Sequence, residues 1–259
     1  MGPDELRRLA EGLLADYDAR TPGRRLPEGP DLTTTEAYAL QDEVACLRER
    51  RGEKVIGYKV GCTSRAIREQ LGVAQPVFGR VFATGCLPSG ARLARACYAR
   101  LGVEGELAVR LGRDVAGAAS TAECLGAIDA VFPVIELHHH VLPAAWSPGL
   151  WLVASNGMHA GFVRGDAEKR CPGPADFRHR LSIHLDGVAV ETFEDSGRVP
   201  GPVRSLRWLA GRLAAFGRRL TAGQVVLTGS AMKLYPTAAV RRILVDAGPL
   251  GRSCAELEP

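Results

Sequence analysis

The sequence has 259 residues, of which 46% are hydrophobic and 24% are charged, which is ordinary for a folded protein with a sizeable core. One large domain is as compatible with this length as two. The formal net charge is only +4, and the basic residues are scattered, as in the pairs Arg24–Arg25 and Arg218–Arg219. This distribution disfavours nucleic-acid binding, which needs basic residues gathered on one face.

The cysteines and the absence of long apolar segments indicate the compartment. Seven cysteines, an odd number without a CxxC spacing, argue against a disulfide framework or a structural zinc site and favour a reducing environment. The first residues mix acidic and basic side chains and contain no apolar core of a signal peptide. The sequence contains no run of about 18 uncharged apolar residues, the length that a membrane-spanning helix needs. We therefore expect a cytoplasmic protein that has no membrane partner.

Residues 1–52 are predicted to form a small N-terminal helical cap. Apolar residues recur at helical spacing over residues 4–18, which predicts an amphipathic helix. Thr33 and Glu36 then form a capping-box signature that opens a second helix, which is expected to end near Arg51.

Residues 53–259 are predicted to form a β-rich catalytic domain. Short runs with strand-like alternation are separated by turns, and Asp186-Gly187 between two of them is a strong hairpin signal. Ser120 and Glu123 form a second capping box. Many short strands with few helices indicate a sandwich or barrel-like core rather than a doubly wound sheet. The expected helices are about 64–71, 121–129 and 202–219, and the expected strand-like runs are 55–61, 101–111, 130–137, 159–165, 180–191, 224–229 and 241–248.

The first candidate site is the segment Val103-Glu104-Gly105-Glu106-Leu107. Residues i and i+2 of a strand point to the same side, with Cα atoms about 6.5–7 Å apart. Glu104 and Glu106 therefore aim two carboxylates at one spot. Two like charges so close need a counter-charge, which a hard divalent cation can supply. From this segment alone, a solvated strand face with two harmless glutamates is the favoured interpretation.

A second segment changes that balance. Residues 130–137 form a nearly continuous apolar run that ends in Glu136-Leu137, which is typical of a buried strand. A buried carboxylate needs a partner, and a cation shared with Glu104 and Glu106 would be one. The alternative is a strand-end glutamate that emerges into water.

Three histidines, His138, His139 and His140, follow directly. If the strand continues, His138 and His140 share the side of Glu136 and could join or replace the carboxylate ligands. That would favour manganese, iron or zinc over magnesium. We favour instead a histidine-rich loop after the strand, because the chain is expected to turn at Pro143.

Two more segments could contact a small anionic substrate. Lys59 lies in an otherwise apolar run bracketed by glycines, and its ammonium could neutralise a carboxylate or transfer a proton. A lysine that snorkels from an edge strand is the alternative. Residues 225–230 end in Thr228-Gly229-Ser230, where the backbone and two hydroxyls could dock an anionic group, although strand-to-turn transitions often have this composition.

These segments, in this order, make the chain resemble the fumarylacetoacetate hydrolase superfamily, specifically its branch of 2-oxopent-4-enoate hydratases and 4-oxalocrotonate decarboxylases. The likeness covers nearly the whole chain, and no single segment is specific by itself. The segments that carry it are 37–41, 57–64, 70–82, 103–109, 134–137, 155–163, 225–230 and 248–257.

The resemblance implies a β-rich α+β fold, like the C-terminal domain of fumarylacetoacetate hydrolase, with a small N-terminal helical cap. It also implies Mg²⁺ or Mn²⁺ on Glu104, Glu106 and Glu136, Lys59 as the catalytic residue, and a homo-oligomer. The residues that we expect to bind the substrate are Phe78, Asn156, His159, Thr228, Gly229 and Ser230.

The chain departs from the family pattern at three places. Val77 stands where hydratases of this branch usually carry an acidic residue, whereas the related decarboxylases tend to have an apolar one. His139, His140 and Val141 replace the usual D-S-R after the third glutamate. Ser155 replaces an acidic residue before an Asn-Gly pair. Acid–base groups beyond the metal site are therefore missing or relocated, which predicts a divergent subgroup with a different 2-oxo acid substrate.

We hypothesise a metal-dependent lyase that acts on a small unsaturated 2-oxo acid, in which the metal chelates the C1 carboxylate and the 2-oxygen and stabilises the enolate. Water addition, as in a 2-oxopent-4-enoate hydratase, is placed slightly ahead of decarboxylation of a 4-oxalocrotonate-type acid. An acylpyruvate-type C–C hydrolase is a third possibility and would need a base such as His138, His139 or His159. A non-catalytic protein that binds a 2-oxo acid is the alternative from outside the enzymes.

Overall fold

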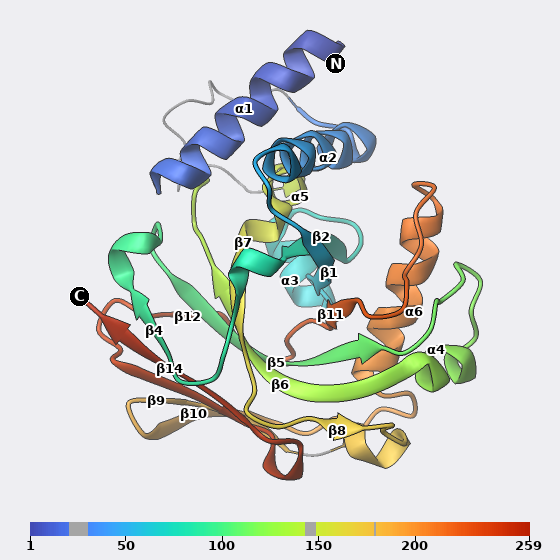
Figure 1. Cartoon of the computed structure of the whole chain (residues 1–259), viewed down its shortest axis with the longest axis vertical. Coiled ribbons are helices and arrows are strands. Elements are labelled where there is room, and N and C mark those ends of the chain that lie inside the picture. The colour runs from blue at the N-terminus through green and yellow to red at the C-terminus, as the bar shows by residue number, and fades with distance from the viewer. Residues whose placement is uncertain (21–30, 143–148, 179) are drawn as a thin grey trace.

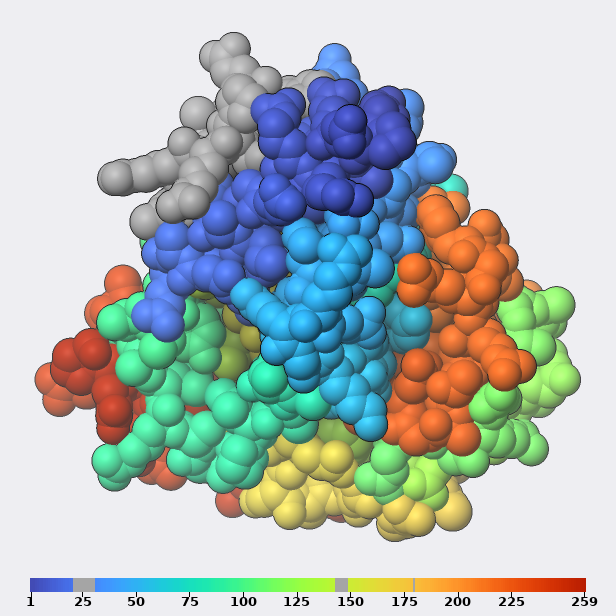
Figure 2. All heavy atoms as spheres, turned by 45° about the horizontal axis from the view of Figure 1, so that its top comes forward, coloured from blue at the N-terminus to red at the C-terminus, as the bar shows by residue number. Residues whose placement is uncertain are grey.

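The computed structural model describes residues 1–20, 31–142, 149–178 and 180–259. Its first part is a pair of helices, α1 (Pro3–Ala19) and α2 (Thr34–Arg50). Thr33 and Glu36 form the predicted capping box, with each side chain bonded to the other residue's backbone N–H. Both predicted helices are therefore confirmed, and Figure 2 shows them in blue across one end of the molecule.

The two N-terminal helices pack on each other and on the short helix α5 (Gly149–Ala154), which the sequence did not predict. Their shared apolar cluster contains Leu9, Leu13, Leu40 and Trp151. Because six residues give only about one and a half helical turns, no periodicity in the sequence marks α5.

A nine-stranded sheet occupies the centre of the described part of the chain, and its strands curve beneath the N-terminal helices (Figure 1). Its strand order is β2-β1-β11-β5-β6-β7-β3, with β12 paired to β5 and β8 paired to β6. The strands are β1 (Val55–Gly61), β2 (Val77–Phe82), β3 (Cys86–Leu87), β5 (Gly102–Leu111), β6 (Ile128–His138), β7 (His159–Arg164), β8 (Lys169–Arg170), β11 (Val225–Leu227) and β12 (Tyr235–Pro236).

The two sides of strand β5 differ in chemistry, as the alternation predicted. Val103, Leu107 and Val109 are buried in the main apolar core, whereas Glu104 and Glu106 lie on the other side. In the antiparallel pair of β5 and β6, Glu104 stands directly opposite Glu136. Register alone therefore brings two glutamates from segments about thirty residues apart to one place.

A second, five-stranded sheet has the order β10-β9-β13-β14-β4. The predicted hairpin at Asp186-Gly187 is confirmed, since both residues have positive φ and connect two antiparallel strands. The strands are β4 (Ala91–Ala94), β9 (Leu181–Leu185), β10 (Val188–Phe193), β13 (Arg242–Asp246) and β14 (Arg252–Glu258).

The remaining predicted helices begin close to where the sequence predicted; α3 (Arg65–Leu71) ends where expected, and the other two end earlier. Helix α4 ends at Ala127 because Ile128 already begins β6, and α6 ends at Ala214, shortly before Gly217 adopts a positive φ. The helices are α3 (Arg65–Leu71), α4 (Thr121–Ala127) and α6 (Gly201–Ala214), and short 3₁₀ turns lie at Ala83–Gly85, Arg95–Cys97, Asn156–Met158, Pro174–Phe177 and Gly248–Leu250.

The predicted β-rich α+β architecture is confirmed, and each strand-like run named from the sequence contains a strand. Residues 77–82, which are not among the strand-like runs named from the sequence, form the buried strand β2. Among the described helices, none is long and apolar enough to cross a membrane.

Gln41 connects α2 to the central sheet. It is 1% exposed, and its Nε2 donates hydrogen bonds to the carbonyl oxygens of Phe78 (2.9 Å) and Val153 (2.7 Å). Its Oε1 accepts one from Arg80 Nη1 at 2.9 Å. This single side chain therefore joins the helix to β2 and α5.

We predict that Gln41→Ala lowers the free energy of unfolding by about 2–4 kcal/mol, because it leaves buried hydrogen-bonding groups without a partner. Glu49→Ala, at an exposed position of the same helix, should change it by less than about 0.5 kcal/mol. Chemical denaturation followed by circular dichroism measures both values. Equal stability of the two variants would contradict this role of Gln41.

Candidate metal centre

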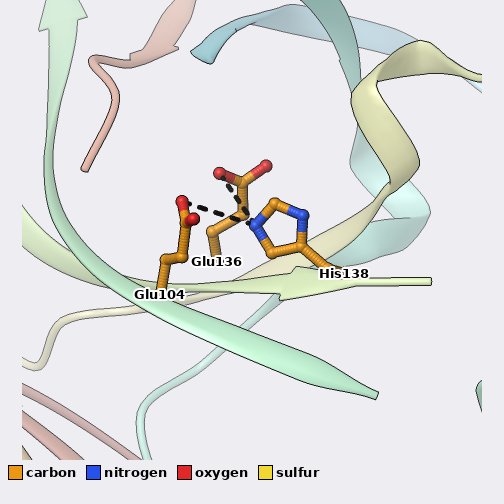
Figure 3. A group of neighbouring side chains, drawn as sticks. All are labelled: Glu104, Glu136 and His138. Atoms are coloured by element: carbon orange, nitrogen blue, oxygen red, sulfur yellow. Dashed lines mark ion pairs between the residues drawn. The ribbon is translucent and has the colours of Figure 1, made fainter. Parts of the chain in front are cut away.

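Three side chains on β5 and β6 converge at the end of the central sheet. His138 is the last residue of β6, and its Nε2 lies 3.5 Å from Glu104 Oε2 and 3.6 Å from Glu136 Oε2 (Figure 3). One potential ligand atom from each of these three residues lies within 4.8 Å of the others. We call Glu104, Glu136 and His138 the metal-centre cluster.

Burial leaves several polar atoms near this cluster without partners. Glu106 and Glu136 are each 1% exposed and His138 is 6% exposed. Among the described residues, Glu106 Oε1, Glu136 Oε2, His138 Nε2 and His159 Nε2 have no hydrogen-bond partner. Buried polar atoms without partners raise the free energy of the fold. A divalent cation would satisfy carboxylate oxygens and an imidazole nitrogen together, so these residues fit such an ion.

Lys59 supplies positive charge beside the cluster. Its Nζ lies 3.1 Å from Glu136 Oε1, and the residue is 3% exposed. Strand β1 lies between β2 and β11, so the alternative of a lysine snorkelling from an edge strand is wrong. Gly61 and Gly157 make room for the ammonium, because a Cβ at these positions would lie 3.0 Å and 3.3 Å from Nζ.

The charges of these groups influence one another strongly. Burial by itself lowers the pKa of Lys59, but Glu136, Glu104 and Glu106 outweigh it and raise that pKa above its ordinary value. Burial raises the pKa of Glu136, but Lys59 and His138 overcome this effect and hold it well below the ordinary range. For His138, burial is likewise outweighed, here by Glu136 and Glu104, which raise its pKa to about 9.

Glu106 lies next to the cluster rather than within it. Its Oε2 accepts a hydrogen bond from the Gly229 N–H. Burial, and then the neighbouring negative charge of Glu136, raise the pKa of Glu106 well above its ordinary value. Glu106 therefore adjoins Glu136, and an added positive charge would stabilise its ionised form.

The segment Thr228-Gly229-Ser230 supports the site in a way that the sequence did not indicate. The Thr228 hydroxyl donates to the carbonyl of Leu107 at 2.7 Å, and the Ser230 hydroxyl donates to that of Gly105 at 2.9 Å. Both hydroxyl protons are thus engaged with the backbone of β5. In this arrangement the segment positions Glu106 through the Gly229 N–H.

The histidines after Glu136 separate into different roles. The expectation that all three lie in a loop is wrong for His138, which belongs to β6; Pro143 lies outside the described residues. His139 Nδ1 accepts from the Ala99 N–H at 2.9 Å, and its Nε2 lies 2.9 Å from the Tyr17 carbonyl oxygen. With both ring nitrogens engaged, His139 has no nitrogen left for proton transfer.

The other residues expected at the substrate differ in how free their side chains are. His159 Nδ1 lies 2.7 Å from Glu136 Oε1, which places it at the cluster. Phe78 is stacked on Tyr38, with ring centroids 4.3 Å apart. The Asn156 amide bonds to the backbone N–H and carbonyl of Arg80. The Phe78 and Asn156 side chains therefore hold β2 in place.

A cavity of about 240 Å³ lies beside Glu106, Thr228 and Gly229. Its wall includes apolar side chains that were not predicted from the sequence, because they come from segments far from the glutamates along the chain. The local sequence around an apolar residue does not indicate which cavity its side chain will line. The apolar side chains of the cavity wall are Phe177, Leu181, Phe193 and Trp208.

No protein-family model matches the chain, but individual known proteins are similar to it over most of their length. A 2-keto-4-pentenoate hydratase of Paraburkholderia phymatum is 31% identical over 214 residues, which cover 82% of this chain and 80% of that relative. A 4-oxalocrotonate decarboxylase of a Pseudomonas species is 30% identical over 262 residues, covering 96% and 98% of the two chains.

The fold is shared as well as the sequence. The structure of 4-oxalocrotonate decarboxylase from Pseudomonas putida G7, complexed with magnesium and adipate, matches with a TM-score of 0.91 and 25% identity, over 100% of this chain and 99% of that one. Relatives at 30% identity or more over most of their length establish common descent. The chain therefore belongs to the fumarylacetoacetate hydrolase superfamily, in its branch of 2-oxopent-4-enoate hydratases and 4-oxalocrotonate decarboxylases.

Proposed function

We propose that the protein is a metal-dependent lyase that adds water to a small unsaturated 2-oxo acid of the 2-oxopent-4-enoate type. The observation that carries this proposal is the group formed by the half-buried Glu104 and the buried Glu136 and Lys59, which combines clustered carboxylates with a fixed ammonium. A relative that is named as a hydratase of 2-keto-4-pentenoate supports the reaction.

The cofactor in this proposal is a divalent cation, Mg²⁺ or Mn²⁺, held by Glu104, Glu106 and Glu136. Magnesium in the similar decarboxylase structure supports this class of ion. The partnerless oxygens of Glu106 and Glu136 support these ligands. A bound ion of this kind supplies a Lewis acid for the carboxylate and the 2-oxygen of a 2-oxo acid.

In this proposal, side chains of the protein bind the substrate and transfer protons. Lys59 keeps its ammonium charged next to Glu136 and can therefore neutralise a substrate carboxylate or donate a proton to the substrate. His159 orients Glu136 through Nδ1 and retains a buried Nε2 without a partner among the described residues. Burial lowers the pKa of His159, so its ring is neutral and could accept a proton.

Decarboxylation of a 4-oxalocrotonate-type acid is the second candidate, and Val77 favours it. Val77 is 3% exposed and packs beside Gly61, next to Lys59. An apolar side chain there cannot hold and activate a water molecule as a carboxylate would. An acylpyruvate-type hydrolase ranks lower, since His139 is engaged at both nitrogens and the raised pKa of His138 keeps that ring protonated, which leaves His159 of the three expected histidines as a base. A non-catalytic binder ranks last because the named relatives are enzymes.

The cavity beside Glu106 is proposed to receive the end of the substrate that lies away from the 2-oxo acid. At about 240 Å³ it exceeds the cavity of about 150 Å³ that accommodates benzene in another protein. Two carboxylates, Asp195 and Glu106, line it together with one arginine, Arg204, which is exposed and donates to the Val199 carbonyl. An uncharged tail therefore suits this cavity better than a second carboxylate.

The proposal also includes a cytoplasmic location, a homo-oligomer, and the division into a cap of residues 1–52 and a catalytic domain of residues 53–259. The odd number of cysteines supports a reducing compartment. The packing of α1 and α2 on α5 supports the cap. The homo-oligomer rests on the family resemblance alone.

The reaction can be tested by proton NMR of metal-stripped protein with 2-hydroxypenta-2,4-dienoate and, separately, 2-oxohex-3-enedioate. We expect water addition to the dienoate after Mg²⁺ is added, and none in its absence. Glu106→Ala should abolish the activity. Loss of CO₂ from the diacid instead would establish the decarboxylase. No change in the spectrum of either compound would contradict the lyase proposal.

Lys59→Met should lower kcat about 100-fold or more, because it removes the ammonium without changing the length of the side chain much. Lys54→Met, at an exposed position just before the same strand, is the matched control and should retain full activity. Steady-state kinetics on the accepted substrate measures both variants, with circular dichroism to compare their folds. A fully active, folded Lys59→Met protein would exclude a catalytic role.

Phe193→Arg should shift substrate preference towards dicarboxylates, because it places a positive charge at the rim of the cavity. We expect the ratio of kcat/KM for a dicarboxylate over a monocarboxylate 2-hydroxydienoate to rise about ten-fold or more. Val190→Arg adds the same charge on the same exposed strand but does not line the cavity, so it should leave the ratio unchanged. Equal ratios in both variants would show that the tail binds elsewhere.

A further inference from the structure

We infer that His138 is a nitrogen ligand of the divalent cation, so that the centre prefers Mn²⁺ over Mg²⁺. This inference rests on the proposed function, which supplies three carboxylate ligands and leaves the choice of ion open. The inference adds the imidazole nitrogen of His138 as a fourth protein ligand beside the three carboxylates.

The His138 ring nitrogen lies at the spacing from two carboxylate oxygens that is expected of ligands sharing one ion. Its Nε2 lies 3.5 Å and 3.6 Å from one oxygen of Glu104 and one of Glu136, which is too long for good hydrogen bonds. Two donors that each lie about 2.1 Å from the same ion are about 3–4 Å apart, depending on the angle between them. The observed spacing therefore suits ligands that share a cation better than it suits a direct contact.

The position of the ring follows from the strand. Because side chains alternate along β6, Glu136 and His138 face the same side. Backbone pairing of His138 with Gly102 on β5 and with His159 on β7 fixes this register on both sides. This packing leaves only 6% of His138 exposed, and Figure 3 shows its ring nitrogen directed at both carboxylates.

A charged imidazolium that serves only as a counter-charge is the competing explanation for the same geometry. It predicts a histidine that pairs with Glu104 and Glu136 in the metal-free protein and makes no bond to an added ion. The two explanations therefore differ in whether a nitrogen is bonded to the bound metal.

The choice of ion follows from the ligand. Mg²⁺ binds oxygen ligands almost exclusively and keeps several waters, whereas first-row transition ions accept imidazole nitrogen readily. A centre with an imidazole among its carboxylates should therefore discriminate against Mg²⁺ more strongly than carboxylates alone.

The test uses Mn²⁺ as the probe on the full-length protein stripped of metal. Pulsed electron paramagnetic resonance should detect coupling of the bound Mn²⁺ to a histidine nitrogen in the natural sequence. The coupling should persist in His140→Gln, whose ring Nδ1 contacts the Arg100 carbonyl instead, and disappear in His138→Gln. Calorimetric titrations should show the ratio of Mn²⁺ to Mg²⁺ affinity falling about ten-fold or more in His138→Gln alone.

Each outcome decides the inference. Mn²⁺ bound without nitrogen coupling, or coupling that survives in His138→Gln, would overturn it while leaving the proposed cation site intact. If His138→Gln does not fold, His159→Gln makes the assignment, because nitrogen coupling that persists in His159→Gln cannot come from His159, the other buried histidine beside Glu136. Failure of the natural protein to bind either ion would instead refute the cation site of the proposed function.

Discussion

The burial of several carboxylates in one place is the constraint on which the rest of this structure depends. Glu104 and Glu136 stand opposite each other across β5 and β6, and Glu106 lies beside them. Like charges at such distances in a poorly solvated interior repel strongly unless positive charge offsets them. Lys59 supplies part of it, and its mutual effect with Glu136 on their pKa values shows how closely the two are coupled.

Neighbouring parts of the fold accommodate this charged group. Gly61 and Gly157 lack the Cβ atoms that would crowd the Lys59 ammonium, and the Gly229 N–H binds Glu106. His159 contributes a further contact to Glu136. These contacts orient the carboxylates before any ligand arrives, and preorganisation of this kind lowers the free energy needed to assemble a reactive geometry.

Two side chains near the carboxylates bear on the chemistry that this chain can perform. The relatives include a protein named as a hydratase and one named as a decarboxylase, so one family carries out more than one reaction. Val77, which is apolar, pairs with Gly61 on the strand that carries Lys59, and the His138 ring is directed at Glu104 and Glu136. One fold can support different reactions because function depends on the particular side chains at its site.

Local sequence patterns predicted the longer helices, most of the longer strands and the main charged residues of this protein, but not α5 or β2. The capping boxes at Thr33 and Ser120 were predicted correctly because the residues that define them are three positions apart. The buried positions of Lys59 and Glu136 follow from the apolar runs that contain them. Only the tertiary structure decided that His138 joins the carboxylates and that Thr228 and Ser230 bond to the backbone of β5. Those contacts depend on strand register between distant segments, which no local pattern encodes.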